Sequence, residues 1–241
     1  MIDQRVLARV VLLLAAAFPL TATAAGAGAG APYWEQPTIN LDNRASLQRG
    51  AQLFVNYCMG CHSAKYHRWM HVADDLGIPD DVVEENLIWI TDEEGKRAQV
   101  GSLMTIAMDD EYGEQVFGGP PPDLTLTSRS RGPAWIYNYL RTFYLDPDSP
   151  TGVNNPVLTN AAMPHVLWPL QGWQVPVYEE DADGGKHIVG FERVREGSMP
   201  PAQYDRALND LVNFMVYLGE PARMNRAAIG GWVLTFLVVL L

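Results

Sequence analysis

The sequence predicts a mainly α-helical single domain with a targeting segment before it and an apolar segment after it. Three observations predict this architecture. Apolar residues recur at helical spacing after Asn43 and again between Pro201 and Leu218, glycine and proline are dense between these segments, and only one short region alternates apolar and polar residues. At 241 residues, 48% of them hydrophobic, the chain is long enough to bury one sizeable core.

The first residues have the layout of an export signal. Arg5 and Arg9 precede an apolar run from Val10 to Leu20, and small residues follow up to Ala24. We therefore expect residues 1–24 to be a signal peptide. A retained membrane helix is the alternative, which the shortness of the apolar run disfavours.

Residues 25–222 form the predicted globular domain, which begins with a Gly- and Ala-rich linker over residues 25–40. A helix is expected from Asn43, a polar residue that can cap its start, and it leads directly to Cys58. Its core-facing positions recur at helical spacing, at Leu47, Ala51, Phe54 and Val55.

The remainder of the domain is predicted to be less regular until its last helix. Residues 74–159 mix short helical stretches with turn signals, and residues 134–144 are the clearest helix among them. A small hairpin is expected within residues 164–194. The strongest helical pattern covers residues 201–218, and Gly219 is expected to end it.

The last segment, residues 223–241, is predicted to be the start of a C-terminal transmembrane anchor. Residues 227–241 carry no charge, and as a helix they would reach about 22 Å at about 1.5 Å per residue. A hydrocarbon core is about 30 Å thick, so we expect the span to be truncated and the full product to continue to a basic cytoplasmic tail. A buried terminal helix is the alternative, which apolar residues on every face disfavour.

Both cysteines of the chain lie in Cys58-Met59-Gly60-Cys61-His62. By chance, C-x-x-C-H would arise in roughly one of several thousand sequences of this composition. Two thiols three residues apart can add to the vinyl groups on one edge of a haem, while the next imidazole binds the iron. The motif therefore predicts one covalently bound haem c, attached at Cys58 and Cys61 with His62 as iron ligand, and one-electron transfer.

Three other uses of the motif account for the sequence less well than haem attachment does. A disulfide would close a loop too small to stabilise a large domain and would leave His62 unexplained. A thioredoxin-like redox pair would need a surrounding βαβ pattern. A zinc site would need further ligands, and no second cluster is present in the sequence.

Reasoning from the residues alone does not identify the sixth iron ligand. A methionine would raise the reduction potential and block small ligands. We set aside the candidates that lie in the last helix, beside the predicted anchor or close to the motif. Met163 and Met199 then remain. Of these two, Met199 is favoured as sixth ligand by its position before the last helix. The full set of candidates is Met70, Met104, Met108, Met163, Met199, Met215, Met224, His67, His71, His165 and His187.

Several stretches together resemble the cytochrome c1 family, the haem c subunit of the ubiquinol–cytochrome c reductase (bc1) complex. The resemblance covers nearly the whole mature chain, and the stretches that carry it are residues 45–58, 121–124, 139–144, 163–168, 210–214 and 219–221. It implies a class I cytochrome c-like single domain with loop insertions and a C-terminal transmembrane helix, truncated here. It also implies Met163 as sixth ligand, with Met199 as the alternative, and Arg131 beside a haem propionate, with Arg129 as the alternative.

The resemblance further implies an electron relay. The domain would lie in the periplasm at the bacterial inner membrane, beside cytochrome b and the Rieske iron–sulfur subunit, and would pass electrons to a soluble basic cytochrome c without being catalytic itself. Two other functions stay open: a membrane-anchored cytochrome that serves a terminal oxidase or periplasmic reductase, and a haem sensor or peroxidase with an open sixth site.

The charge balance is acidic, with 28 Asp and Glu against 17 Lys and Arg and a net charge of −11. This balance argues against nucleic acid as a partner, because such proteins carry a basic patch. Without residues 1–24 the count is 27 acidic to 15 basic residues, a charge of −12. A field of this sign can steer a basic redox carrier, although any single acidic cluster is explained by solvation alone.

Overall fold

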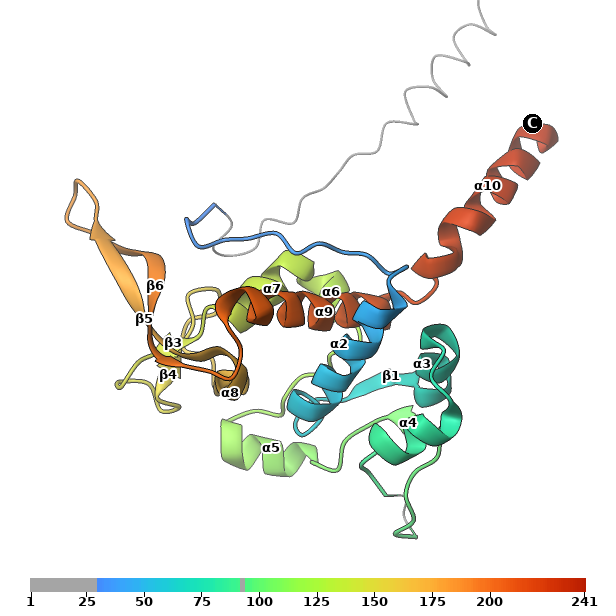
Figure 1. Ribbon diagram of the computed structural model, residues 1–241, viewed down its shortest axis with the longest axis horizontal. Coiled ribbons are helices and arrows are strands. Elements are labelled where there is room, and N and C mark those ends of the chain that lie inside the picture. Colours follow the sequence, from blue (N-terminus) through green and yellow to red (C-terminus); the bar gives the residue numbers. More distant parts are fainter. Residues whose placement is uncertain (1–29, 92–93) are drawn as a thin grey trace, which may run out of the picture.

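The computed structural model describes residues 30–91 and 94–241, so the predicted signal peptide, residues 1–24, lies outside the described residues. The fold is helix-rich, as the sequence predicts (Figure 1). The helices are α2 Arg44–Tyr57, α3 Trp69–Leu76, α4 Asp80–Asn86, α5 Asp110–Phe117, α6 Thr127–Ser130, α7 Pro133–Arg141, α8 Trp168–Gln171, α9 Pro201–Gly219 and α10 Arg223–Leu240. Three antiparallel two-stranded sheets pair β1 Ala64–Arg68 with β2 Leu103–Met104, β3 Tyr144–Leu145 with β4 Val153–Asn154, and β5 Gly172–Glu180 with β6 Lys186–Glu196.

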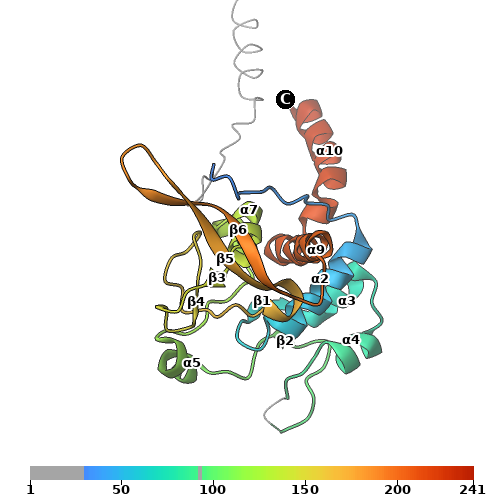
Figure 2. The same ribbon diagram turned by 60° about the vertical axis from the view of Figure 1, so that its left-hand side comes forward.

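Helices α2 and α9 cross at the centre of the core (Figures 1 and 2). The crossing is close at Gly50, where an added Cβ would lie 2.2 Å from the carbonyl oxygen of Asp210. One turn further on, the rings of Phe54 and Phe214 have centroids 5.5 Å apart. The helical stripes that the sequence predicts on both segments therefore face each other, and burying them supplies the main driving force for this contact.

A buried carboxylate fastens the same crossing. Asp210 accepts a hydrogen bond from the Ser46 hydroxyl at 2.5 Å and forms an ion pair with Arg49 at 2.6 Å. Because the carboxylate is only 9% exposed, its charge needs these donors to offset the cost of leaving water. At the start of α2, the Asn43 side chain accepts from the backbone N–H of Ser46, which caps the helix as expected from the sequence.

The described part of the predicted linker, residues 30–40, is an irregular segment fastened along the helices. The backbone N–H groups of Thr38 and Asn40 donate to the side chains of Asn209 and Asn213 on α9, at 2.7 and 2.9 Å. Glycine and alanine content predicts a loose connection, but asparagine side chains far along the chain satisfy its backbone instead. The segment therefore follows α9 closely.

Several element boundaries differ from the predicted ones. The helix expected over residues 134–144 is α7, which ends at Arg141, and the predicted hairpin is β5–β6, preceded by a loop and α8. Helix α9 ends at Gly219 as predicted, and Gly219 is not in the left-handed conformation. A Cβ there would lie 2.4 Å from the Ser128 hydroxyl, so a larger residue would force that side chain to shift.

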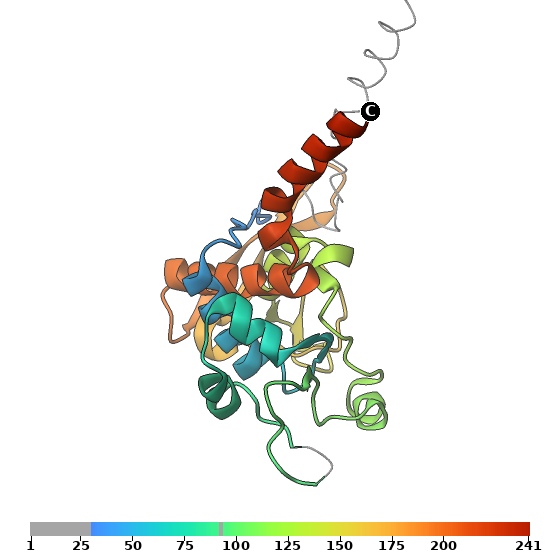
Figure 3. The same cartoon turned by 90° about the vertical axis from the view of Figure 1, so that its right-hand side faces the viewer.

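Helix α10 corresponds to the predicted start of the anchor and extends away from the rest of the fold (Figure 3). No helix among residues 30–91 and 94–241 is both long and apolar enough to cross a membrane. Membrane insertion of residues 223–241 stays a prediction.

Candidate haem site

The attachment turn, residues 58–62, continues α2 by one tight turn. The backbone N–H of Cys58 donates to Phe54, and those of Cys61 and His62 both donate to the carbonyl of Cys58, at 3.0 and 2.9 Å. These bonds hold the two cysteines and the histidine on one compact turn. The motif residues are therefore together for the local reason that the sequence suggests.

Both cysteines are free thiols. Cys58 is buried, and that burial, with a smaller contribution from Cys61, raises the pKa of its thiol to about 12. Disulfide oxidoreductases need a thiolate at neutral pH, which requires a lowered pKa. The environment of Cys58 therefore disfavours the thioredoxin-like alternative.

His62 is oriented by a backbone carbonyl from a distant segment. Its Nδ1 lies 2.8 Å from the carbonyl oxygen of Pro122, which can only accept, so Nδ1 carries the proton and Nε2 keeps its lone pair. Burial lowers the pKa of the imidazole, although the Pro122 carbonyl and Asp123 oppose the shift. A neutral imidazole fixed in this tautomer is the usual state of a histidine that binds a metal through Nε2.

The segment that supplies Pro122 is fastened to the chain after the motif. The backbone N–H of Leu124 donates to Ser63 at 2.8 Å, and that of Lys65 donates to the Asp123 carboxylate at 2.7 Å. Sequence reasoning singled out the stretch 121–124 but gave it no role toward His62. No local signal could have done so, because the two partners are 60 residues apart.

The candidate methionines divide by burial. Met104 and Met215 are core residues, 0% and 3% exposed, and Met70 is largely exposed. Met163 and Met199 are half-buried at the edge of the core, in the loops before α8 and before α9. The two loops meet at α8, because the backbone N–H of Met199 donates to Leu170 at 3.1 Å.

The two candidate arginines have different partners. Arg129 forms an ion pair with Glu220 at 2.8 Å, which engages it at the end of α9. The Arg131 guanidinium lies 5.2 Å from the ring centre of Trp135, and in the described part of the chain no carboxylate pairs with it. Arg131 is therefore the better placed of the two to receive an anionic group.

An aromatic row that sequence reasoning missed joins α7 to the Met163 loop. Successive ring centroids are 4.9 to 5.7 Å apart, starting beside Arg131 and ending on α8. Helical spacing on α7 indicates that Trp135 and Tyr139 lie on one face. The rings beyond α7 join the row because of the path that the chain takes afterwards. The row consists of Trp135, Tyr139, Phe143, His165, Trp173 and Trp168.

Two histidines that were sixth-ligand candidates are buried. His165 lies in the aromatic row, and His67 lies 5.2 Å from the ring of Tyr217, measured between centroids. Burial is the main reason that the pKa of each falls to about 4, so both are neutral at pH 7. Its contact with Tyr217 packs His67 against α9, away from the methionine loops at α8.

The chain is similar to known proteins over most of its length. The profile of the Cytochrome C1 family matches residues 33–241. The chain is 44% identical over 228 residues to cytochrome c1 of Allochromatium vinosum, across 94% of this chain and 91% of that protein. The chain belongs to the cytochrome c1 family.

Other relatives are similar over most of the chain. The chain is 41% identical over 203 residues to a Nitrosomonas europaea protein named ammonia monooxygenase gamma subunit, across 84% of this chain and 80% of that protein. It is 29% identical to the mitochondrial cytochrome c1 heme protein of Schizosaccharomyces pombe, across 82% of this chain and 63% of that protein. Membership of the cytochrome c1 family implies a haem c cofactor and an electron-transfer role, which fits two free thiols beside an imidazole with an available Nε2.

Proposed function

We propose that this cytochrome c1 carries one covalently attached haem c and relays single electrons within a bc1-type complex. The observation that carries the proposal is the His62–Pro122 contact at the end of the turn that holds Cys58 and Cys61. It leaves Nε2 of a neutral imidazole free beside two unpaired thiols, which is the donor set that covalent haem attachment requires.

Five residues are assigned to holding the group. Cys58 and Cys61 form the thioethers, His62 binds the iron through Nε2, Met163 is the sixth ligand, and Arg131 pairs with a propionate. When bound there, the haem supplies a one-electron Fe(III)/Fe(II) couple. Half-burial fits Met163 and Met199 equally, so the assignment of Met163 rests on the family. The absence of a carboxylate partner in the described residues supports that of Arg131.

The family and the charge of the surface support a proposed electron route. We assign the Rieske iron–sulfur subunit as donor, cytochrome b as neighbour and a soluble basic cytochrome c as acceptor. The first turns of α4 and α5 expose acidic pairs, Asp80 with Asp81 and Asp110 with Glu111. Such surface charges speed the arrival of a cation and lose their effect as salt screens them.

We assign the location to the bacterial inner membrane, with the globular domain in the periplasm and residues 223–241 as the beginning of a single membrane anchor. The apolar character of α10 after its first turn supports this assignment. On this assignment the haem site would lie outside the membrane, where a soluble carrier can reach it.

Purification of the full chain from membranes in mild detergent tests the proposal. A di-haem cytochrome b and a Rieske protein are expected to co-purify, and quinol should reduce the c-type haem. Isolation with a terminal oxidase and without those two subunits would contradict it.

The acceptor is tested separately by stopped-flow oxidation with a basic cytochrome c. The rate should fall as ionic strength rises, and the paired change D80N/D81N should lower both the rate and its salt dependence. Arg68→Gln is the matched control for altering a surface charge, and it should not reduce the salt dependence. A rate that salt leaves unchanged would contradict acceptance by a basic carrier.

A further inference from the structure

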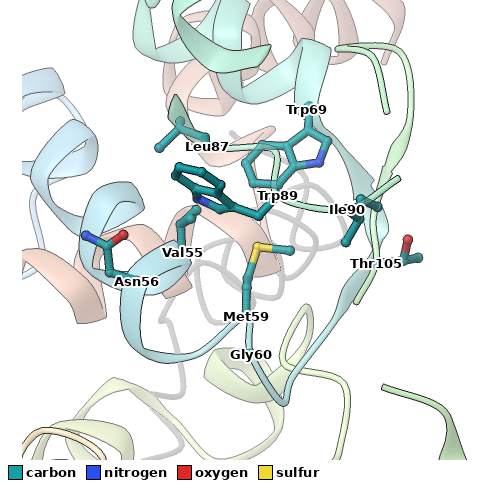
Figure 4. Close-up of a pocket in the computed structure, with 9 residues that line it drawn as sticks. All are labelled: Val55, Asn56, Met59, Gly60, Trp69, Leu87, Trp89, Ile90 and Thr105. Atoms are coloured by element: carbon teal, nitrogen blue, oxygen red, sulfur yellow. The ribbon is translucent and has the colours of Figure 1, made fainter. Parts of the chain in front are cut away.

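Two cavities border the attachment turn, and they differ in charge. The larger, about 290 Å³, is shown in Figure 4, and no charged side chain of the described residues lines it. The smaller, about 100 Å³, is lined by Cys61 and by four charged residues, which are Lys65, Asp109, Asp110 and Asp123. The charge beside the turn therefore comes from one side.

Asp123 differs from the other three charged residues by its position. The other three are exposed, whereas Asp123 is half-buried and directly follows Pro122, whose carbonyl oxygen lies 2.8 Å from His62 Nδ1. Burial lowers the pKa of His62, while the Pro122 carbonyl and the charge of Asp123 raise it. Because a partly buried charge is screened less than an exposed one, Asp123 is the charge of this group that acts most strongly on the imidazole.

Two backbone donors hold the Asp123 carboxylate in place. Its Oδ2 accepts from the N–H of Lys65 at 2.7 Å, and its Oδ1 accepts from the N–H of Thr125 at 3.0 Å. No ion pair within the described residues includes Asp123. Neutral donors fix the carboxylate without cancelling its charge, so a full negative charge is held next to the Pro122 carbonyl.

Both effects of this carboxylate act on the same imidazole. Fixing the Pro122 carbonyl keeps its hydrogen bond with Nδ1–H of His62, which makes the imidazole a stronger donor to a metal. A negative charge close to the ligand favours Fe(III) over Fe(II), because the oxidised iron carries one more positive charge. The two effects therefore have the same sign.

We propose that Asp123 is a positioning residue that lowers the reduction potential of the haem iron, a role that rests on the proposed ligation by His62. It holds the Pro122 carbonyl against Nδ1 and keeps a negative charge beside the ring. Asp123 itself neither binds the iron nor forms a bond to the haem.

Asp123→Asn tests the charge, because it keeps the shape of the side chain and an oxygen that can accept from Thr125. The midpoint potential of the haem-loaded full chain is measured in detergent at pH 7 by spectroelectrochemical titration. We expect the equilibrium constant for reduction to rise about two- to tenfold, a shift of about 20 to 60 mV at 59 mV per tenfold. The sulfur-to-iron charge-transfer band should persist, which separates this shift from loss of the sixth ligand.

Two control variants separate the charge at this position from charge in general. Asp123→Glu keeps the carboxylate, so its potential should lie closer to that of the unaltered protein than the potential of Asp123→Asn does. Glu179→Gln removes the same charge from β5 near the tip of the β5–β6 hairpin, which projects from the rest of the fold (Figure 1). It should leave the potential unchanged.

An unchanged or lowered potential in Asp123→Asn would overturn the proposal. Asp123→Ser is a second neutral variant, since a serine hydroxyl can also accept from the N–H two residues further on. Loss of haem attachment in both neutral variants would overturn the proposal as well, because Asp123 would then act in assembly. Absence of haem stain from the unaltered protein would instead contradict the proposed function.

Discussion

The two sides of the predicted haem site are built in different ways. The near side is the attachment turn, residues 58–62, which is five consecutive residues held by backbone hydrogen bonds at the end of α2. The far side consists of the two loops that carry Met163 and Met199, which no regular element contains. Local chemistry is therefore enough to build the near side, whereas the far side needs contacts from elsewhere in the chain.

Amide side chains hold the far side in place. At the end of α7, the carbonyl of Tyr139 accepts from Asn155 at 2.6 Å, and that of Arg141 accepts from Gln171 at 2.7 Å. The carbonyl of Phe143 accepts from Gln174 at 2.8 Å. Carbonyls at a helix end lack partners within the helix, so these amides satisfy them and fix the loop on either side of Met163.

The largest expected effect tests the near side. Replacing Cys58 and Cys61 together with alanine should abolish covalent haem attachment, because no other cysteine exists to form a thioether. The measurement is haem staining on a denaturing gel, with Met59→Leu as a control that keeps both thiols. Stain retained by the double variant would refute the attachment site.

The next effect tests the far side. Met163→Leu should abolish the sulfur-to-iron charge-transfer band and lower the midpoint potential by on the order of 100 mV, within the roughly 0.8 V range that axial ligands span. Met199→Leu is the matched control, since both residues are half-buried in loops that meet at α8. If Met199→Leu alone removed the band, the ligand assignment would be reversed.

The helix crossing behind the near side should be intolerant of a methyl group. Gly50→Ala would place a Cβ against the backbone oxygen of Asp210, which cannot turn aside, and should cost about 3 kcal/mol of unfolding free energy. Gly101→Ala is the control, because a Cβ there meets nothing within 4 Å. Equal denaturation midpoints for the two variants would show that α2 and α9 can move apart at Gly50 at little cost, contrary to this prediction.

The far side should depend on its amides. Asn155→Ala leaves the Tyr139 carbonyl buried without that donor and should cost about 2 kcal/mol in chemical denaturation. The same change should weaken the charge-transfer band, since the loop toward Met163 loses its contact with α7. Asn86→Ala, which removes an exposed side chain–backbone bond within α4, should change neither quantity.

The smallest expected effect concerns pH. Burial lowers the pKa of His67 to about 4 in the folded state, below the usual value of about 6.5 in the unfolded chain. The unfolded state therefore takes up a proton first as pH falls, and stability is lost between about pH 6.5 and 4. Between pH 7 and 5 the loss should be about 1 to 2 kcal/mol more than in His67→Gln, measured by denaturation at each pH. Parallel curves for the two proteins would contradict the burial of a neutral imidazole.

Sequence reasoning predicted most of what depends on neighbouring residues. The stripes of α2 and α9, the Asn43 cap and the turn with Cys58 and His62 all follow from spacing of a few residues, and the structure contains them. It predicted the end of α9 at Gly219, but not the close contact that a Cβ there would make with the Ser128 hydroxyl. It also missed the aromatic row, because half of that row lies outside α7 and its following residues: His165 is in the loop after β4, Trp168 in α8 and Trp173 in β5.

The sequence by itself was enough to predict the cofactor chemistry, because thioether formation and histidine ligation need only five consecutive residues. Only the tertiary structure decided which carbonyl orients His62, which arginine is left without a carboxylate partner in the described residues, and how the loops of Met163 and Met199 meet at α8. The physical reason is that these contacts join residues far apart in the chain, and their positions are set by how α2, α7 and α9 pack rather than by local spacing.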